Sequence, residues 1–389
     1  MFSSRIPWER APNRLARAVA SARSDARALI DLTATNPTTT GIGYPDDLLR
    51  RLASPAALVY TPHPFGLPEA RDAVARDYRR RGMAIDSAGV VLTASTSEAY
   101  SLLFKLLCDA GDAVLVPVPS YPLFDHLTRL DCIRASTYQL EYHGRWMVDF
   151  ETVDRSWSPA VRAVLGVSPN NPTGSILSEG ELSELENRCA DRDAALILDE
   201  VFADYPLQAE GGHTAGPGLR GRALTFRLGG LSKSAGLPQV KLGWIGVDGP
   251  EPLVREALER LDIICDAYLS VSTPVQVAAP ELIDTAHQVR ARICTRIAGN
   301  YAELRRQASG HPSIQVLAAE AGWSAVVRVP STRAEEELVL ELVERDGVLV
   351  HPGFFFDFPH ESFVIVSLLP EPAVFAEGVG RMLERARAS

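Results

Sequence analysis

The chain has 389 residues, of which 46% are hydrophobic and 23% charged, a composition that excludes disorder as its main state. Its length predicts about two or three domains, or one large domain with a smaller one. A net charge of −10 argues against a protein that binds duplex nucleic acid, because phosphate contacts need a basic face.

The cysteines and the N-terminus indicate the compartment. The five cysteines are scattered, with no C-x-x-C pair and no histidine spacing that would complete a zinc site. We therefore expect free thiols in a reducing compartment, which makes the cytoplasm the default location. The N-terminal segment lacks the apolar core of a signal peptide, and no charge-free apolar stretch reaches the roughly 18 residues of a membrane span.

Short apolar runs alternate with longer segments of helical periodicity over the first two thirds of the chain. Each run is bounded by turn residues, and the runs are 89–93, 113–117, 161–167, 195–199, 223–226 and 243–247. Strands that are buried on both faces and separated by helices are typical of a mostly parallel sheet. The sequence therefore predicts an α/β fold, with a large domain over residues 46–280.

The last third of the chain has a different pattern. Helical periodicity dominates from Glu251 to about Arg306, with an interruption at 270–274. Strand-like runs follow at 323–329, 348–351 and 363–368, with helix candidates at 333–346 and 371–387. This pattern predicts a smaller α+β domain, made of residues 281–389 together with an N-terminal segment, residues 1–45, that folds back onto it.

Polar residues follow several of the apolar runs, which is where ligands bind in an open parallel sheet. Ser95 and Thr96 come after the run 89–93 and open a helix, so their donors and the helix dipole suit an anion. A helix N-cap alone is the simpler explanation of these hydroxyls. The segment 168–174, with its asparagines and prolines, is by itself explained as a turn.

Two further segments carry ionisable groups. Asp199 ends the run 195–199 and Glu200 follows it directly. A buried carboxylate at this place needs a cationic or hydrogen-bonding partner. Lys233 stands between two serines, where a lone lysine is usually a solvated loop residue. Neither segment identifies a catalytic site by itself.

Taken together, these segments resemble the fold-type I pyridoxal-phosphate enzymes, specifically the class I and II aminotransferases. Ser-Pro-Asn-Asn-Pro-Thr-Gly at 168–174, Asp-Glu-Val-Phe at 199–202 and Ser-Lys-Ser at 232–234 stand in the order of that family, with similar intervals. Further matches are Tyr60 with Gly-Leu-Pro-Glu-Ala-Arg at 66–71, and Pro-Ser-Tyr-Pro at 119–122. The resemblance runs from about residue 36 to the C-terminus and implies a cofactor-binding large domain and a small α+β domain.

The resemblance implies a role for each central residue. Lys233 forms a Schiff base with the aldehyde of pyridoxal 5'-phosphate and later moves the proton between substrate and cofactor, which makes it the catalytic residue. Asp199 pairs with the pyridine nitrogen and keeps it protonated. Asn171 hydrogen-bonds the phenolic oxygen of the ring and, in the family, can also contact a substrate carboxylate. The peptide bond before Pro172 is a candidate for the cis form.

The remaining cofactor contacts follow from the same resemblance. Tyr121 stacks on the pyridine ring, unless it is only a packing aromatic. The phosphate is held by Ser95, Thr96, Ser232 and Lys241, with Tyr60 reaching it from the neighbouring subunit. This last contact implies a homodimer that shares its active sites.

Three positions depart from the common pattern of the family. Phe202 stands where a tyrosine usually donates a hydrogen bond to the phenolic oxygen, so we expect a more basic Schiff base. Lys241 replaces an arginine at the phosphate, a change that keeps the charge. Ile365 stands where an arginine usually pairs with the α-carboxylate of the substrate.

The missing arginine bears on the choice of substrate. Each charge-assisted hydrogen bond contributes about 1.5–3 kcal/mol, so the loss of a two-bond clamp weakens α-amino acid binding by a few powers of ten. Arg328 could compensate, although a surface arginine is its simpler interpretation. Alternatively the substrate lacks an α-carboxylate, as an amine or amino sugar would, or the cofactor is used for another reaction. By analogy with the family, His351 and the aromatic run 354–356 lie near the pocket mouth, where they pack or contact substrate.

The leading hypothesis is a dimeric aminotransferase that moves an amino group between an amine or amino acid and an oxo acid or aldehyde. The alternative keeps the cofactor but changes the bond, as in a lyase, a decarboxylase, a replacement enzyme or a carbon-carbon bond-forming enzyme. A non-catalytic regulator joined to a DNA-binding module is disfavoured, because only about 30 residues precede the first family-like motif. We expect neither a nucleic-acid nor a membrane partner.

Overall fold

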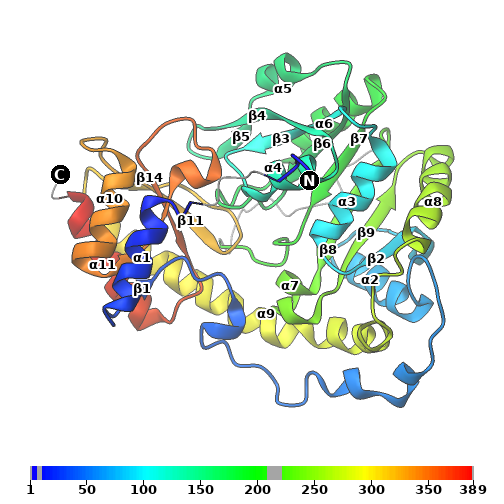
Figure 1. The fold of residues 1–389 in the computed structure, drawn as a ribbon, viewed down its shortest axis with the longest axis horizontal. Helices are drawn as coiled ribbons and strands as arrows, with labels where there is room; N and C mark the ends of the chain where they lie inside the picture. Colours follow the sequence, from blue (N-terminus) through cyan, green and yellow to red (C-terminus); the bar gives the residue numbers. More distant parts are fainter. Residues whose placement is uncertain (1, 7–10, 208–220, 388–389) are drawn as a thin grey trace.

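The computed structural model describes residues 2–6, 11–207 and 221–387. A large sheet with its helices forms one part of the molecule, and a small sheet with the N-terminal and C-terminal helices forms the other (Figure 1). The long helix α9 runs beneath both parts. None of the helices in these described ranges has the length and apolar character needed to span a membrane.

The large sheet has eight strands in the order β2-β9-β8-β7-β6-β3-β4-β5. Its strands are β2 Val90–Thr93, β3 Ala113–Val118, β4 Arg134–Tyr142, β5 Trp146–Val148, β6 Val161–Val167, β7 Ala195–Asp199, β8 Thr225–Gly230 and β9 Gly243–Asp248. The central strands from β8 to β4 pair in parallel, whereas β9 and β5 are antiparallel to their neighbours. The prediction of a mostly parallel α/β sheet is therefore confirmed.

Helices cover both faces of this sheet, because alternate strand residues point to opposite sides. Val114 and Ile197 pack in one core cluster with helices α3 and α8, whereas Leu115 and Leu196 pack in another with α6. The helices of the large part are α2 Pro68–Arg80, α3 Thr96–Leu107, α4 Leu123–Leu130, α5 Phe150–Ser156, α6 Glu179–Asp191, α7 Leu231–Ser234 and α8 Glu251–Asp266. This double cover explains why the central strands read as continuous apolar runs.

The small part is built around an antiparallel sheet in the order β10-β11-β14-β13. Its elements are α1 Arg14–Ser24, β1 Ile30–Asp31, β10 Gln315–Val316, β11 Ser324–Arg328, α10 Glu335–Glu341, β12 Val348–Leu349, β13 His351–Pro352, β14 Phe363–Ser367 and α11 Pro372–Arg387. Strand β1 pairs in parallel with β12, which confirms that the N-terminal segment folds back onto this part. The run expected at 348–351 is divided between β12 and β13, which belong to different sheets.

Helix α9, Thr273–Ala308, joins the two parts. The boundary expected at residue 280 falls inside this helix, at its internal Pro280, and the division into 46–280, 1–45 and 281–389 stays a prediction. Short helical turns complete the chain: η1 Pro37–Thr39, η2 Arg50–Ala53, η3 Pro55–Leu58, η4 Ser87–Gly89, η5 Pro238–Val240, the π-helix η6 Leu342–Asp346 and η7 Gly353–Phe356.

Candidate active site

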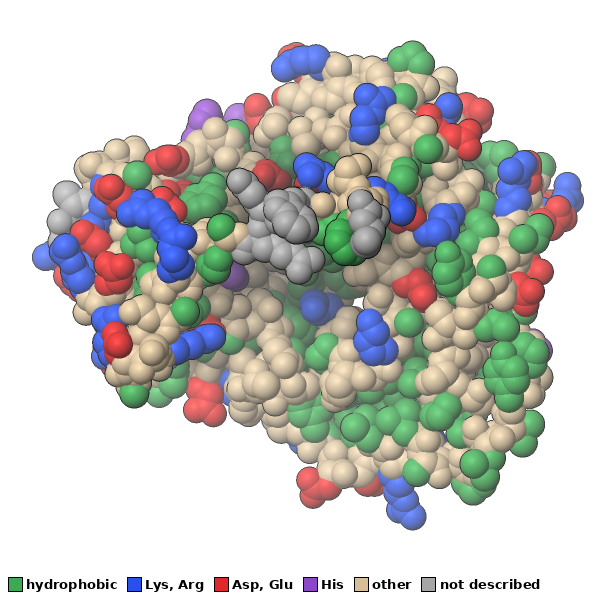
Figure 2. Space-filling model, in the orientation of Figure 1, with side chains coloured by type: hydrophobic (Ala, Val, Ile, Leu, Met, Phe, Trp, Pro, Cys, Tyr) green, Lys and Arg blue, Asp and Glu red, His purple; other side chains and the backbone are tan. Residues whose placement is uncertain are grey.

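A cavity of about 300 Å³ opens beside the carboxyl ends of the central parallel strands, a volume at the lower end for small-molecule sites. The molecule is visibly hollowed between its two parts (Figure 2). Of the residues predicted from the sequence, those that line this cofactor cavity are Ser95, Thr96, Tyr121, Asn171, Asp199, Ser232, Lys233 and Lys241. The fold thus brings together residues that lie up to 146 positions apart, and only Tyr60 of the predicted set lies elsewhere.

Asp199 and Lys233 form the ionisable centre of the cavity. Asp199 is the last residue of β7 and is 8% exposed, while Lys233 lies on the short helix α7. Burial raises the pKa of the Asp199 carboxyl, and its hydrogen bonds and the nearby Lys233 oppose that shift. Burial lowers the pKa of the Lys233 amine, against the attraction of Asp199. A lysine with a lowered pKa is more readily neutral and therefore a better nucleophile.

Tyr100 is a site residue that the sequence reasoning missed. Its hydroxyl donates to Asp199 Oδ2 over 2.7 Å, and the Val201 amide donates to Oδ1 over 3.1 Å. Tyr100 lies four residues after Thr96 on α3, so both face the same side of the helix. That spacing, next to a predicted anion site, is the signal that could have found it.

Aromatic rings surround the amine of Lys233. The Nζ atom lies 5.7 Å from the ring centre of Phe202 and 5.5 Å from that of Trp323. These two rings meet edge to face with their centres 5.3 Å apart. Phe202 therefore packs against the lysine. It offers no hydrogen-bond donor, as expected for a phenylalanine in place of a tyrosine.

The resemblance implies a covalent linkage between Lys233 and the cofactor, and replacing Phe202 by Tyr is expected to lower the pH at which that linkage loses its proton. The added hydroxyl would stabilise the deprotonated ring oxygen, so the linkage would hold its proton less tightly. A spectrophotometric pH titration of both holoenzymes measures the midpoint directly. Phe202→Leu, which adds no donor, serves as the control, and an unchanged or higher midpoint in Phe202→Tyr contradicts the interpretation.

The opposite end of the cavity suits an anion. Ser95 caps α3, its Oγ accepting from the Glu98 amide over 3.2 Å, so the free amides of the first turn and the helix dipole face the cavity. Ser232 and Lys241 line the same cavity. A Cβ on Gly243 would lie within 3.0 Å of the backbone of Ser95 and Thr96, so only glycine allows β9 to approach this turn so closely.

Asn171 and Tyr121 stand where the cofactor cavity meets a second one. The bond between Asn171 and Pro172 is cis, as the sequence reasoning anticipated. The Asn171 side chain accepts a long hydrogen bond of 3.4 Å from Ser324 Oγ. Tyr121 is 47% exposed and lines both cavities, a position open to stacking.

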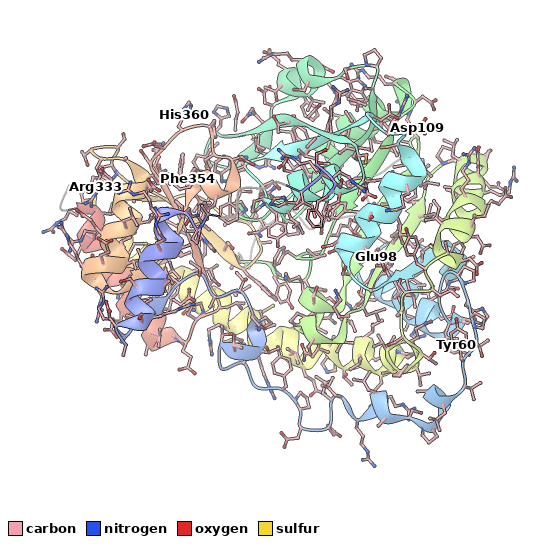
Figure 3. The ribbon with its side chains drawn as sticks, in the orientation of Figure 1. Tyr60, Glu98, Asp109, Arg333, Phe354 and His360 are labelled. Atoms are coloured by element: carbon pink, nitrogen blue, oxygen red, sulfur yellow. The ribbon has the colours of Figure 1, made fainter. Side chains whose placement is uncertain are left out.

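The second cavity, which we name the side chamber, has a volume of about 180 Å³. It shares Thr35, Tyr121, Asn171 and Ser324 with the cofactor cavity and is otherwise lined by Thr33, Pro122, His351, Phe355, Phe356, Ile365 and Ser367. Ile365 and His351 therefore face the site, whereas Phe354 lies outside this lining and is 45% exposed (Figure 3). Arg328 bonds Gln315 on the exposed side of β11, and so does not replace the missing arginine.

Tyr60 is 68% exposed and lies at the edge of the large part, away from the cofactor cavity (Figure 3). Its neighbours Leu58 and Val59 are exposed as well. Tyr60 and Tyr268 together line a pocket on this surface. A contact of Tyr60 with the phosphate of a neighbouring subunit stays a prediction.

The residues present fit pyridoxal 5'-phosphate. A buried carboxylate at one end suits a protonated ring nitrogen, the first turn of α3 suits a phosphate, and a lysine of lowered pKa stands between them. The order of the large sheet and the site at its carboxyl ends add the matching architecture. Fold and site together define a fold-type I pyridoxal-phosphate enzyme.

Comparison with known proteins identifies the family. Residues 44–372 match the family described as aminotransferase class I and II, and the chain belongs to it. It is 25% identical over 358 residues to the glutamate-pyruvate aminotransferase AlaA of Escherichia coli K12, covering 88% of this chain and 87% of that one. It is 23% identical to a tyrosine aminotransferase of Dictyostelium discoideum, over 85% and 81% of the two chains.

Solved structures show the same fold. An alanine aminotransferase from Pyrococcus furiosus superposes with a TM-score of 0.90 and 22% identity over the whole of both chains. An aminotransferase from Escherichia coli gives 0.87 and 21% identity over 99% of this chain and 97% of the other. The chain is thus a pyridoxal-phosphate-dependent aminotransferase, and these relatives do not favour the alternative chemistries on the same fold.

Proposed function

We propose that this aminotransferase uses Lys233 as its catalytic residue, on small-molecule amino and oxo substrates. The supporting observation is the position of the Lys233 amine, which shares one buried cavity with Asp199 and is bordered by Phe202 and Trp323. Few lysines in a folded protein are desolvated next to a single buried acid.

Each residue of the cavity is assigned a separate role in the proposed reaction. Pyridoxal phosphate, when bound, supplies an aldehyde that takes up amino groups and a ring that accepts electrons from the substrate carbon. Lys233 holds the cofactor covalently and then moves a proton at its Nζ atom. Asp199, held by Tyr100 and the Val201 amide, keeps the ring nitrogen protonated. Asn171 would hold the ring oxygen, and Tyr121 would stack on the ring.

Phosphate binding orients the cofactor between these groups. The first turn of α3 at Ser95 and Thr96 supplies amides and hydroxyls, and Lys241 supplies a positive charge. Ser232 adds a hydroxyl from the residue before the lysine. Water exclusion by Phe202 and Trp323, both buried, strengthens the interactions within the cavity.

The working unit is proposed to be a homodimer in the cytoplasm. Exposed apolar side chains, among them Leu58, Val59, Tyr60, Ile263 and Tyr268, give the large part a surface suited to a second subunit (Figure 2). All five cysteines are free, which suits a reducing compartment. A sedimentation measurement that finds only monomeric holoenzyme would contradict the shared site.

Single-turnover spectroscopy tests the proposed function. Holoenzyme mixed with a panel of amino acids and amines should lose the absorbance of the aldehyde form and gain that of the amine form of the cofactor. Holoenzyme reduced beforehand with borohydride should show no change, because its linkage to Lys233 no longer exchanges. If no donor of the panel converts the cofactor, the proposal is wrong.

A further inference from the structure

The side chamber is the place where the part of the substrate beyond its amino group must lie. It adjoins the cofactor cavity through Tyr121, Asn171 and Ser324, and its far wall belongs to the small part of the molecule. Any donor that reaches Lys233 through this shared boundary leaves the rest of its structure in the chamber. The chemistry of the chamber wall therefore selects the substrate.

The wall opposite the shared boundary is apolar. Ile365, at the centre of β14, is 1% exposed and pairs across the sheet with His351. Phe355 and Phe356 follow on the turn η7, and their rings lie near the imidazole of His351, with centres 6.0 and 5.7 Å from it. A surface of this kind binds hydrocarbon and gives a carboxylate no partner.

This apolar wall is held firmly in place. The buried Glu335 accepts hydrogen bonds from the Phe354 amide over 3.0 Å, the Ser362 amide over 3.1 Å and the Phe363 amide over 2.9 Å. One carboxylate thus ties the turn that carries Phe355 and Phe356 to the start of β14. Small movements of the turn are therefore costly, and the chamber keeps its apolar shape.

Two hydroxyls of the small part that line the chamber are engaged within the protein. Thr33 Oγ1 donates to Asp31 Oδ1 over 2.6 Å, and Ser367 Oγ donates to the Ala34 carbonyl over 2.6 Å while it accepts from the Leu369 amide. Both hydroxyls thus donate their protons to acceptors inside the protein. They have none left to donate to an anionic substrate group.

The chamber also has no fixed positive charge. Neither an arginine nor a lysine is among its lining residues within the described ranges, and Lys233 and Lys241 line only the cofactor cavity. Burial lowers the pKa of His351, although the nearby Asp31 partly opposes the shift, so the imidazole is neutral around pH 7. The charge that acts on this imidazole is the negative one of Asp31, and a negative charge repels a carboxylate.

We propose that the preferred amino donor is a primary amine with an apolar substituent and no carboxylate on the carbon that carries the nitrogen. This inference rests on the proposed function and specifies its substrate class. The donor loses its amino group and leaves as an aldehyde, whose oxygen comes from water. The nitrogen stays on the cofactor until an oxo compound accepts it and releases its own oxygen as water. Because the acceptor enters the same chamber, aldehydes should also react faster than the corresponding 2-oxo acids.

Matched pairs of donors test the inference on the holoenzyme. Butylamine and L-norvaline differ only by the carboxylate, as do 2-phenylethylamine and L-phenylalanine. In single turnovers, in whichever of the two pairs reacts faster, the amine should show a second-order rate constant at least about 10-fold above that of the amino acid, since a buried carboxylate without a cationic partner is costly. If the amino acid reacts as fast or faster, the inference is overturned and the aminotransferase function stands. If no member of either pair or of the wider donor panel reacts, the proposed function fails, and the inference fails with it.

Variants at the chamber wall sharpen the test. Ile365→Arg supplies the missing cation and should shift the ratio at least about 10-fold toward the amino acid, whereas Ile365→Leu keeps the apolar wall and should keep the preference for the amine. An unchanged ratio in a folded Ile365→Arg holoenzyme contradicts the inference. Should that variant fail to fold, titration calorimetry on the unaltered holoenzyme, which measures the affinity for two uncleaved ligands, tests the inference instead. There 3-phenylpropanamide should bind more tightly than 3-phenylpropanoate, and the reverse order overturns the proposal.

Discussion

Replacing Lys233 by Ala should abolish covalent attachment of the cofactor and lower the rate of amino-group transfer by about 10³-fold or more. In the proposed mechanism, the change removes both the amine that holds the cofactor and the base that moves the substrate proton. The hydrogen bond that the hydroxyl of Tyr205 donates goes to the backbone carbonyl of Lys233, so the variant keeps it. The fold should therefore survive, and loss of function will report on chemistry.

Two measurements check this expectation. Borohydride reduction followed by peptide mass spectrometry shows which residue carries the cofactor, and single-turnover spectroscopy gives the rate. Lys241→Ala is the matched control, because Lys241 lines the same cavity and is the proposed phosphate ligand. It should weaken cofactor binding and leave the covalent attachment at position 233. An adduct at position 241 in the Lys233→Ala protein, with turnover retained, would show that the roles of the two lysines are wrongly assigned.

The central strands and the site residues at their ends could be predicted, because both follow from local sequence. A run of buried aliphatics such as Ala195–Leu198 has no alternative to a strand covered on both faces, and the acid after it marks the carboxyl end. The strands β6 and β7 begin and end where their apolar runs do. Strand β4, by contrast, lies near the sheet edge with a mixed pattern of exposure, and it was missed.

Residues that act across the fold were harder to find. Tyr100 and Trp323 reach the site from a helix of the large part and from the start of β11, and neither belongs to a motif. Their roles depend on which elements pack together, which periodicity does not reveal. The absence of the arginine at position 365 could be read from the sequence. Only the packing shows that Ile365 faces the site and that Arg328 points elsewhere.

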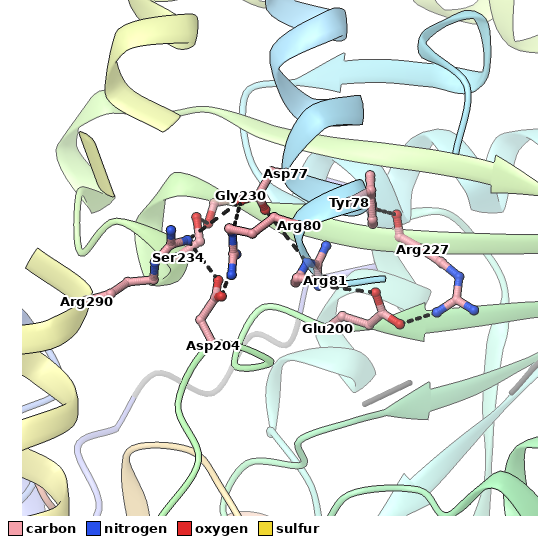
Figure 4. A network of polar contacts seen from close by, with 10 residues as sticks. All are labelled: Asp77, Tyr78, Arg80, Arg81, Glu200, Asp204, Arg227, Gly230, Ser234 and Arg290. Carbon is pink, nitrogen blue, oxygen red and sulfur yellow. Dashed lines mark hydrogen bonds and ion pairs between the residues drawn. The ribbon is translucent and has the colours of Figure 1, made fainter. Parts of the chain in front are cut away.

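A buried network of ions behind the site should dominate the stability of the segment that carries Phe202. Glu200, next to Asp199, pairs with Arg227 in the core and lies 3.5 Å from Arg81, while Asp204 pairs with Arg80 and Arg290 at the other end of the same segment (Figure 4). Both Glu200 and Arg227 are almost fully buried. Glu200 thus neutralises two guanidinium groups, whereas Arg227 is paired with one carboxylate.

This asymmetry leads to unequal effects of mutation. Glu200→Gln should lower the free energy of unfolding by about 3–5 kcal/mol, because it leaves the buried Arg227 without its acid, while Arg81 keeps only Asp77, 3.7 Å away. Arg227→Met should cost less, because Glu200 keeps Arg81 as a partner. Their double mutant should be less destabilised than the sum of the two single changes by about 0.5–3 kcal/mol, as expected for groups in contact. Denaturant unfolding of the holoenzymes, followed by near-ultraviolet circular dichroism, measures all three.

An exposed ion pair provides the control for burial. Asp125 and Arg129 lie 2.9 Å apart on α4, and both side chains are more than half exposed. Asp125→Asn should therefore change the free energy of unfolding by less than about 1 kcal/mol, because solvent screens the charge that remains. Equal losses in Asp125→Asn and Glu200→Gln would contradict the argument from burial. Equal losses in Glu200→Gln and Arg227→Met would contradict the argument that one acid serves two cations.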